Sequence, residues 1–216
     1  MNNLVIIPAR KNSKRLKNKN LLKIGNISLV ERSLKFALSI ENKNNIILST
    51  DSNVIRKFAK KYKIIFLGLR PRQLSSSSST SADVCIYEVK RYENYFKKKI
   101  DNIILLQPTS SFRSIKFFKK TFKIFKKNFL PTISVKSIYD EIIFKQKKNK
   151  TQLVSLLKDH YKPDGNLYII RKKDLFKHKS FIINSCNLSF QKSKKNTIDI
   201  DNIYDLESTN AIYKKN

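Results

Sequence analysis

The sequence is poor in the residues from which several common kinds of site are built. Its 216 residues include two cysteines, two histidines, three glycines and no tryptophan. Cys85 and Cys186 lie far apart and form no CxxC pair, which excludes a zinc site of the usual spacing. We therefore interpret both cysteines as reduced and structural, because a free cysteine usually behaves as a small buried hydrophobe.

Long apolar stretches are also missing. No apolar run approaches the roughly 20 residues needed to span a bilayer. The first apolar segment follows Met1 within a few residues, with no signal-type segment before it. We therefore expect no membrane partner and a cytoplasmic location. The length and a hydrophobic content of 40% predict one domain, residues 1–216, with a core of ordinary size.

Acidic residues are few beside the basic ones. The chain has 46 lysines and arginines against 16 acidic residues, for a formal net charge of +30. Such a charge can mark a nucleic-acid partner. However, lysine, asparagine and isoleucine are all products of A/T-rich codons, and the lysines are spread over the whole chain. We therefore attribute the charge to codon usage and expect no specific nucleic-acid partner.

Strand and helix patterns alternate over the first two thirds of the chain. We expect strands at 3–9, 45–51, 64–67, 102–108 and 132–137, and helices at 28–41, 52–62, 81–96 and 114–129. This alternation predicts an α/β fold with a mostly parallel sheet. Ligands of such sheets bind beyond the carboxyl ends of the strands, where this chain has the polar segments PARKNSK, STDS, LRPRQLSSSSSTS and QPTSSFR.

The pattern changes after residue 138. Residues 141–157 predict a two-stranded ribbon around a polar turn, and residues 165–176 a strand that runs into a short helix. A terminal helix is expected at 202–213. Residues 138–164 are therefore candidates for an arm on the main domain.

The loop after the first strand is strongly basic. Six of the ten residues from Arg10 to Lys19 are lysine or arginine. Neither GxxxxGK[ST] nor GxGxxG is present. A phosphate group would therefore be held mainly by side chains, and Arg10, Ser13, Lys14, Lys19 and Asn20 are the candidates. On charge alone, in so lysine-rich a chain, a solvated loop is the favoured interpretation and an anion site is the alternative.

Six motifs in order narrow this choice. They are IIPARxxSKxxxxKN at 6–20, ILSTDS at 47–52, Arg70-Pro71 with LSSSSSTSADV after it, LLQPTSSFR at 105–113, KPDGNLYI at 162–169 and IDIDNIYDLE at 198–207. Together they resemble the CMP-sialic acid synthetase family, the acylneuraminate cytidylyltransferases. That family activates nine-carbon keto-sugar acids with CTP. The resemblance covers nearly the whole chain.

The resemblance implies a fold and an assembly. The fold would be the three-layer α/β/α nucleotidyltransferase type, also called nucleotide-diphospho-sugar transferase-like, with a mostly parallel sheet and a small inserted arm. Members of the family commonly dimerise through that arm, which maps here to residues 138–180. Phe181 and its aromatic neighbours would complete the site of the partner in the homodimer.

The resemblance also implies a reaction and its residues. The C2 hydroxyl of a nonulosonic acid, which the QPTS segment indicates to be N-acetylneuraminate- or legionaminate-like, attacks the α-phosphate of CTP and pyrophosphate leaves. Arg10, Lys19 and Asp201 would be catalytic. The nucleotide would be bound by Ala9, Arg10, Ser13, Lys14, Lys19, Asn20, Arg70 and Ser81, and the sugar acid by Gln107, Thr109, Ser110, Lys162, Gly165 and Tyr168.

Asp199 and Asp201 are the expected Mg²⁺ ligands. On an extended strand, side chains at i and i+2 share a face, so both carboxylates can reach one hard cation. Without the resemblance, these aspartates would be negative charges placed before a helix N-terminus. Tyr168 similarly has an alternative role in packing, and the QPTS segment an alternative role as a polar turn.

Four departures from the family pattern concern the acceptor more than the donor. Ser77 stands where the family usually has aspartate, Lys162 replaces an arginine and Asp164 replaces an asparagine. The segment PTSPLR has become PTSSFR. The alternatives are therefore activation of another sugar acid, pseudaminate or KDO, or a catalytically impaired member of the family that binds CTP.

Overall fold

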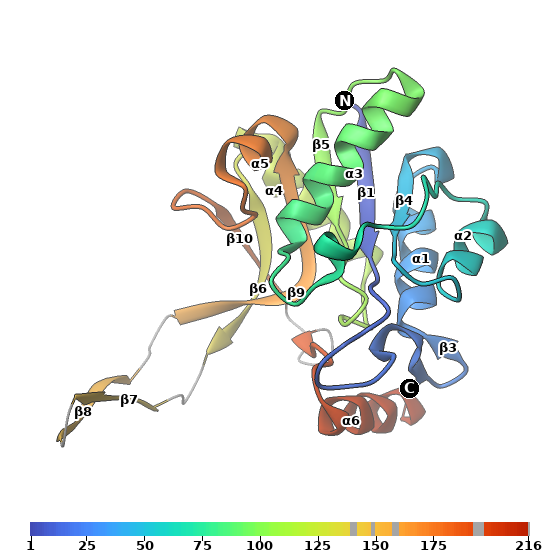
Figure 1. The fold of residues 1–216 in the computed structure, drawn as a ribbon. Coiled ribbons are helices and arrows are strands. Elements are labelled where there is room, and N and C mark those ends of the chain that lie inside the picture. Colours follow the sequence, from blue (N-terminus) through green and yellow to red (C-terminus); the bar gives the residue numbers. More distant parts are fainter. Residues whose placement is uncertain (139–141, 148–149, 157–159, 192–196, 216) are drawn as a thin grey trace.

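The chain folds around a central twisted sheet, shown in Figure 1. The computed structural model describes residues 1–138, 142–147, 150–156, 160–191 and 197–215. The sheet has six strands in the order β10–β6–β9–β5–β1–β4. Their bounds are β1 Asn3–Pro8, β4 Ile46–Ser49, β5 Asn102–Leu105, β6 Thr132–Ile138, β9 His160–Arg171 and β10 Asn187–Phe190.

The strands are mostly parallel, as predicted. β1 pairs in parallel with β4 and β5, and β10 pairs in parallel with β6. β9 is the exception, since it runs antiparallel to both β5 and β6. It therefore brings the KPDGNLYI segment back across the middle of the sheet, beside the loop that follows β5.

Helices cover both faces and complete three layers. α1 (Leu29–Ile40), α2 (Arg56–Tyr62) and α4 (Ile115–Asn128) cover one face, and α3 (Ser81–Phe96) and α5 (Lys172–His178) cover the other. The alternation of β1 sets these layers, because successive strand side chains point to opposite faces. Val5 and Ile7 pack in the core under α1 and α4, whereas Leu4 and Ile6 pack under α3. The predicted α/β/α architecture is confirmed.

Side chains of the expected type begin the long helices. Ser28 accepts a hydrogen bond from the Glu31 amide at the start of α1, and Ser114 does the same for Phe117 at the start of α4. Thr80 and Asp83 form a reciprocal capping box at the start of α3. These caps satisfy amides that have no partner within the helix. The predicted helix at 81–96 has the observed bounds.

At the sheet edges, one predicted strand is reduced and one observed strand was not predicted. The expected strand at 64–67 is reduced to one bridge, between Ile47 and Ile65. The chain leaves α2 through Lys63 in the left-handed region and touches the sheet edge only briefly. The unpredicted strand β10 has only four residues, of which Ser189 alone is buried. A strand with so little apolar periodicity gives no clear sequence signal.

The expected arm at 138–180 divides into two parts. β7 (Ile142–Lys147) and β8 (Lys150–Leu156) form an antiparallel hairpin that projects away from the sheet in Figure 1. Residues 160–171 instead form β9 of the central sheet, and α5 packs against it. The projecting part is thus shorter than the predicted range. Residues 139–141, 148–149 and 157–159 of that range lie outside the described residues.

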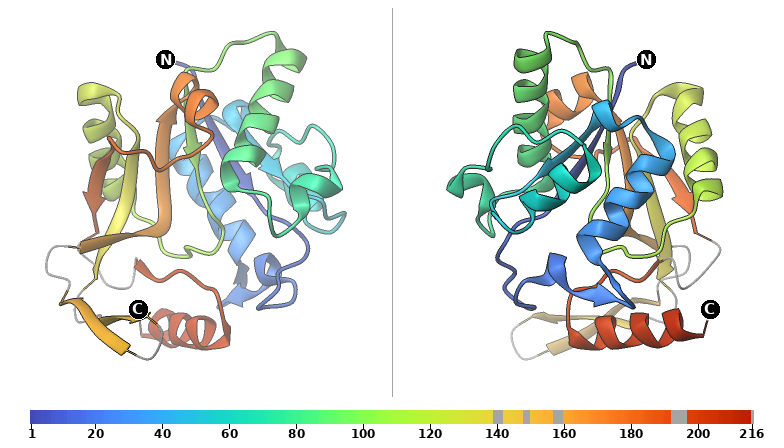
Figure 2. Two further views of the ribbon diagram at one scale, coloured as in Figure 1. Left: turned by 60° about the vertical axis from the view of Figure 1, so that its left-hand side comes forward. Right: turned by 90° about the vertical axis from the view of Figure 1, so that its right-hand side faces the viewer.

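The C-terminal segment returns to the first loop of the chain. α6 (Ile203–Lys214) lies beside the small hairpin of β2 (Lys23–Ile24) and β3 (Ile27–Ser28), as Figure 2 shows. Asn210 accepts a hydrogen bond from the Gly25 amide and donates to the Lys23 carbonyl. Ile200 is buried with Ile24 in a small cluster of its own. This packing carries Asp199 and Asp201 to the basic loop.

No helix in the part of the chain that the structure describes combines the length and apolar character needed to cross a membrane.

Candidate functional site

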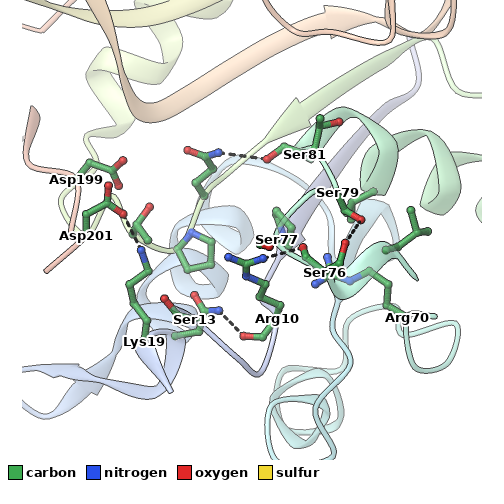
Figure 3. A pocket seen from close by; sticks show the side chains of 18 residues that line it. Arg10, Ser13, Lys19, Arg70, Ser76, Ser77, Ser79, Ser81, Asp199 and Asp201 are labelled. Carbon is green, nitrogen blue, oxygen red and sulfur yellow. Dashed lines mark hydrogen bonds and ion pairs between the residues drawn. The ribbon is translucent and has the colours of Figure 1, made fainter. Parts of the chain in front are cut away.

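A pocket of about 290 Å³ opens beyond the carboxyl ends of β1 and β5 (Figure 3). Four segments far apart in the sequence form its walls: the basic loop after β1, residues 70–84, the loop after β5, and residues 199–201. Ten of the predicted site residues line it: Arg10, Ser13, Lys19, Asn20, Arg70, Ser81, Gln107, Thr109, Asp199 and Asp201. Thus residues predicted for donor, acceptor and metal share one cavity.

Hydrogen bonds fix the shape of the basic loop. The Asn20 side chain donates to the Arg10 carbonyl at 2.8 Å. Arg10 Nη1 donates to the Ser76 carbonyl, also at 2.8 Å, and so joins the loop to the opposite wall. Asn18 adopts a left-handed conformation before the short 3-10 helix η1 (Lys19–Leu21). This turn directs Lys19 into the pocket.

Two cations hold the carboxylate of Asp201. Lys19 Nζ lies 2.8 Å from Asp201 Oδ1, and Arg15 Nη1 lies 2.7 Å from Asp201 Oδ2. Burial raises the pKa of Asp201, but the hydrogen bonds and charges of Lys19 and Arg15 outweigh burial and hold that pKa below its usual range. Asp201 is therefore a carboxylate at neutral pH. Arg15 lies between the motif positions, so sequence reasoning missed this contact.

Asp199 differs from Asp201 in its surroundings. Its Oδ1 atom is buried and makes no hydrogen bond to any described residue. Burial raises the pKa of Asp199, although a hydrogen bond from Thr109 opposes the rise. The Ile200 amide donates to the Thr109 carbonyl at 3.1 Å and so holds the segment against the loop after β5. The site thus contains one buried carboxylate oxygen without a hydrogen-bond partner among the described residues.

These features fit a Mg²⁺ site. Mg²⁺ prefers oxygen ligands and is usually held by one or two carboxylates together with phosphate oxygens and water. Asp199 and Asp201 supply the carboxylates, and Asp199 Oδ1 is an oxygen without a protein partner. No group of three or more histidine, cysteine or acidic residues suited to a metal occurs among the described residues. Further ligands would therefore come from the substrate and water.

The serine run forms the wall opposite the basic loop. Ser76, Ser77 and Ser79 line the pocket, and Ser75 Oγ accepts a hydrogen bond from Nε of the buried Arg70 at 3.2 Å. Burial lowers the pKa of Arg70, while the charges of Asp51 and Glu88 raise it. The motif after Arg70-Pro71 includes this run, but Ser76 and Ser79 were not among the predicted site residues. Its position between the Arg70-Pro71 pair and a helix start was the available signal.

The loop after β5 forms the third wall. Gln107 Nε2 donates to Ser81 Oγ at 3.3 Å, and the buried Ser110 hydroxyl donates to the Asp164 carbonyl at 3.1 Å. Gly165 has φ +74°, and a Cβ atom there would lie 2.9 Å from Ser110 Oγ and 3.2 Å from Asp199 Cγ. Ser110 and Gly165 therefore stand behind the pocket wall and shape it.

The remaining predicted residues lie away from the cavity. The Ala9 side chain is buried in the core, and its amide bonds to the Ser49 carbonyl. Lys14 is exposed on the basic loop. Lys162 lies in β9 and is the register partner of Lys136 in β6. The residues that line the pocket do not include Tyr168, which packs edge-on against Phe181 in the core. Phe181 is itself buried in its own chain, contrary to a role in a partner's site.

Comparison with known proteins supports the family resemblance that the motifs indicate. The Cytidylyltransferase family model matches residues 4–216. The N-acylneuraminate cytidylyltransferase of Escherichia coli O18:K1:H7 is 27% identical over 98% of this chain, which spans about half (52%) of that relative. The CMP-N,N'-diacetyllegionaminic acid synthase of Legionella pneumophila is 28% identical, over 99% of this chain and 97% of the relative.

Solved structures show the same fold. A CMP:2-keto-3-deoxy-manno-octonic acid synthetase, solved in complex with CTP, matches with a TM-score of 0.70. The match covers 100% of this chain and 99% of that chain at 14% identity, so it supports the fold alone. A 4-diphosphocytidyl-2C-methyl-D-erythritol synthase from Anaerococcus prevotii matches with a TM-score of 0.69 at 15% identity, over 98% of both chains. Because the family model spans nearly the whole chain, the protein belongs to the cytidylyltransferase family.

Proposed function

We propose that the protein transfers CMP from CTP to the C2 hydroxyl of a nonulosonic acid that resembles N-acetylneuraminate or legionaminate, with release of pyrophosphate. The observation that carries the proposal is a single pocket lined by Arg10 and Lys19, by Gln107 and Thr109, and by the Asp199–Asp201 pair. The names of the two curated relatives support the choice of acid.

The donor half of the pocket suits a triphosphate. Phosphoryl transfer relies mainly on positioning and on neutralising charge. Arg10 and Lys19 supply positive charge, and Ser13 and Asn20 supply hydrogen-bonding groups in the same loop. Held by the Ser76 carbonyl and by Asp201, the two cations are placed before a ligand arrives. Such preorganisation reduces the reorganisation required during the reaction.

Mg²⁺ is part of the proposal, with Asp199 and Asp201 as the residues that would hold it. When bound, the cation would neutralise phosphate charge and help orient the triphosphate. Lys19 already touches Asp201, so the same side chain can contact the carboxylate pair and the phosphates next to it. The roles of the two aspartates would then differ, with Asp199 the more deeply enclosed of the pair.

The acceptor half offers neutral polar groups. Gln107 and Thr109 present an amide and a hydroxyl to the cavity, suited to the hydroxyl groups of a sugar acid. Asp164, the departure from asparagine, turns its Oδ1 atom toward the Ser134 hydroxyl and the Asn166 amide and does not line the pocket. The substitution therefore need not repel an anionic acceptor.

The assembly and the location complete the proposal. We expect a homodimer in which the β7–β8 hairpin contributes to the contact, and a cytoplasmic location. Sedimentation velocity with and without residues 142–156 tests the first expectation: loss of the hairpin should shift a dimer to a monomer. If the variant without the hairpin still sedimented as a dimer, the role of the hairpin would be contradicted.

Pyrophosphate release tests the activity. Purified protein is mixed with Mg²⁺, one of the nucleotides CTP, UTP, ATP or GTP, and an acid from a panel of N-acetylneuraminate, legionaminate, pseudaminate and KDO. We expect release with CTP and N-acetylneuraminate or legionaminate, and its loss in Lys19→Ala and Asp201→Ala but not in the surface control Lys61→Ala. A CTP-induced rise in melting temperature without any turnover would instead support the impaired, CTP-binding alternative.

A further inference from the structure

Arg113 joins three parts of the molecule by hydrogen bonds. Its Nε atom donates to the Asn166 carbonyl at 3.0 Å and its Nη1 atom to the Ser33 hydroxyl at 3.0 Å, while Nη2 donates to the Gln107 carbonyl. Ser33 belongs to α1, Gln107 to the loop after β5 and Asn166 to β9. One guanidinium therefore fixes that loop against both a helix and the neighbouring strand.

The two carbonyls belong to segments that meet behind the acceptor half of the pocket. The Gln107 carbonyl also accepts a hydrogen bond from the Ser110 amide at 3.2 Å, which closes the turn 107–110. Asn166 directly follows Gly165, where an added Cβ atom would lie 3.1 Å from Gln107 Oε1 and 2.9 Å from Ser110 Oγ. The turn 107–110 therefore packs closely against Gly165. Arg113 joins the two segments, because it donates to the Gln107 carbonyl in the turn and to the Asn166 carbonyl next to Gly165.

The charge of Arg113 is compensated within the protein. Burial lowers its pKa to about 10, while the charges of Asp164 and Asp199 act in the opposite direction. At neutral pH the guanidinium is therefore still protonated and can donate all three hydrogen bonds. A lysine has the charge but lacks the planar fork that reaches several acceptors at once.

We propose that Arg113 is a positioning residue for the sugar-acid acceptor. It is absent from the residues that line the pocket, so it would act through the backbone of Gln107 and through Gly165. The donor loop is held by other partners, since Arg10 bonds to the Ser76 carbonyl and Lys19 to Asp201. Loss of Arg113 should therefore impair use of the acid more than use of CTP. This inference rests on the proposed function.

The test compares Arg113→Lys and Arg113→Met with the control Arg171→Met. Arg171 pairs with Asp174 at 2.7 Å at the far end of β9, remote from the pocket. Initial rates of pyrophosphate release are measured with varied acid at saturating CTP, and with varied CTP at saturating acid. We expect kcat/KM for the acid to fall roughly 100-fold in Arg113→Met, as for a misplaced reactant. The KM for CTP should stay within about twofold, because the donor contacts remain.

The kcat/KM of Arg113→Lys for the acid should lie between the values of Arg113→Met and the wild type. If Arg113→Met does not fold, Arg113→Lys decides the question. Equal losses for acid and CTP, in step with a lower melting temperature, would show a purely structural role and overturn the inference. Unchanged kinetics for the acid would overturn it as well, while leaving the proposed function intact. Absence of turnover by the wild type with every acid would reject the proposed function first, and this inference with it.

Discussion

Lys19 Nζ and Asp201 Oδ1 lie 2.8 Å apart, although 182 positions of sequence separate the two residues. The contact joins the first loop of the chain to the segment that precedes its last helix. Arg15 occupies the second oxygen of the same carboxylate at 2.7 Å. The pocket is therefore closed at one end by an acidic group between two cations, all next to the proposed triphosphate site.

Lys19→Ala should reduce turnover strongly. The side chain of Lys19 is only 14% exposed, so its charge acts in a partly desolvated environment, where a donor to developing charge is worth most. We expect kcat to fall about 10²–10³-fold, in line with loss of one such donor. Steady-state kinetics of pyrophosphate release measure the effect, with Lys61→Ala as the control. A kcat within about threefold of the wild type would remove Lys19 from the catalytic group.

Arg15→Ala should cost more than Lys17→Ala. Arg15 and Lys17 both lie in the basic loop. Of these two residues, only Arg15 contacts Asp201, through a side chain that is 68% exposed. Exposed ion pairs contribute about 0.2–1 kcal/mol, so the expected rise in the KM for CTP is between about 1.4-fold and about fivefold. The KM for CTP should be unchanged in Lys17→Ala. Equal values for the two variants would mean that the Arg15 contact has no functional role.

Asp199→Asn should raise the Mg²⁺ concentration needed for half-maximal rate. The change removes the charge of the only pocket carboxylate oxygen that lacks a partner among the described residues, and Mg²⁺ favours charged oxygen ligands. We expect an increase of at least about tenfold, as for loss of a metal-binding group. A Mg²⁺ titration of the rate measures it, and the exposed Asp101→Asn serves as the control. Full activity of the wild type in EDTA would contradict the metal site altogether.

Gly165→Ala should damage the acceptor half of the pocket and the stability together. Its φ of +74° is costly for alanine, about 1–2 kcal/mol, and the new Cβ atom would crowd Ser110 and Gln107. Gly68→Ala is a matched control, since Gly68 has φ +112° and its added Cβ atom would meet Arg91 instead of Ser110 or Gln107. Urea unfolding should show a loss in both variants. Only Gly165→Ala should raise the KM for the acid, and a similar rise in Gly68→Ala would rule out a local effect.

Glu88→Gln should flatten the pH dependence of stability. Burial raises the pKa of Glu88, and the Ser49 hydrogen bond and the charges of Arg91 and Arg70 only partly oppose it. The folded protein therefore binds this proton more tightly than the unfolded chain. The contribution of Glu88 to the free energy of unfolding then falls as pH rises through the raised pKa.

Urea unfolding between about pH 5 and about pH 8 measures this contribution as the difference in slope between the wild type and Glu88→Gln. The exposed Glu207→Gln is the control and should keep the slope of the wild type. If Glu88→Gln and the wild type had the same slope, the ionisation of Glu88 would not be linked to folding.

Much of the fold was predictable because periodicity and caps agree with it. The apolar run of β1 and the helical spacing in 28–41, 81–96 and 114–129 were local signals that tertiary packing preserved, and the observed caps at Ser28, Thr80 and Ser114 agree with them. The antiparallel placement of β9 was not predictable, because its direction depends on the path of the preceding hairpin. For the same reason, the arm predicted at 138–180 wrongly joined the projecting β7–β8 hairpin to β9, which is a strand of the central sheet.

The site was predictable where residues fall on the motifs and less so between them. Arg10, Lys19, Gln107 and Asp201 meet in the cavity as the motifs imply. Arg15 was lost among the many lysines of the basic loop, since its partner lies at the other end of the sequence. Arg113 ends the motif LLQPTSSFR, but the resemblance gave it no role, because its contacts behind the pocket wall with Ser33 and Asn166 depend on the tertiary fold.

The central claim is tested most directly by identifying the product made from CTP and a nonulosonic acid. Phosphorus-31 NMR and mass spectrometry of a reaction with Mg²⁺ follow both products at once. We predict one equivalent of pyrophosphate for each molecule of CMP-linked sugar acid, with the phosphorus bonded through the C2 oxygen. Intact CTP after incubation with every acid of the panel, in a sample that binds CTP, would contradict the account.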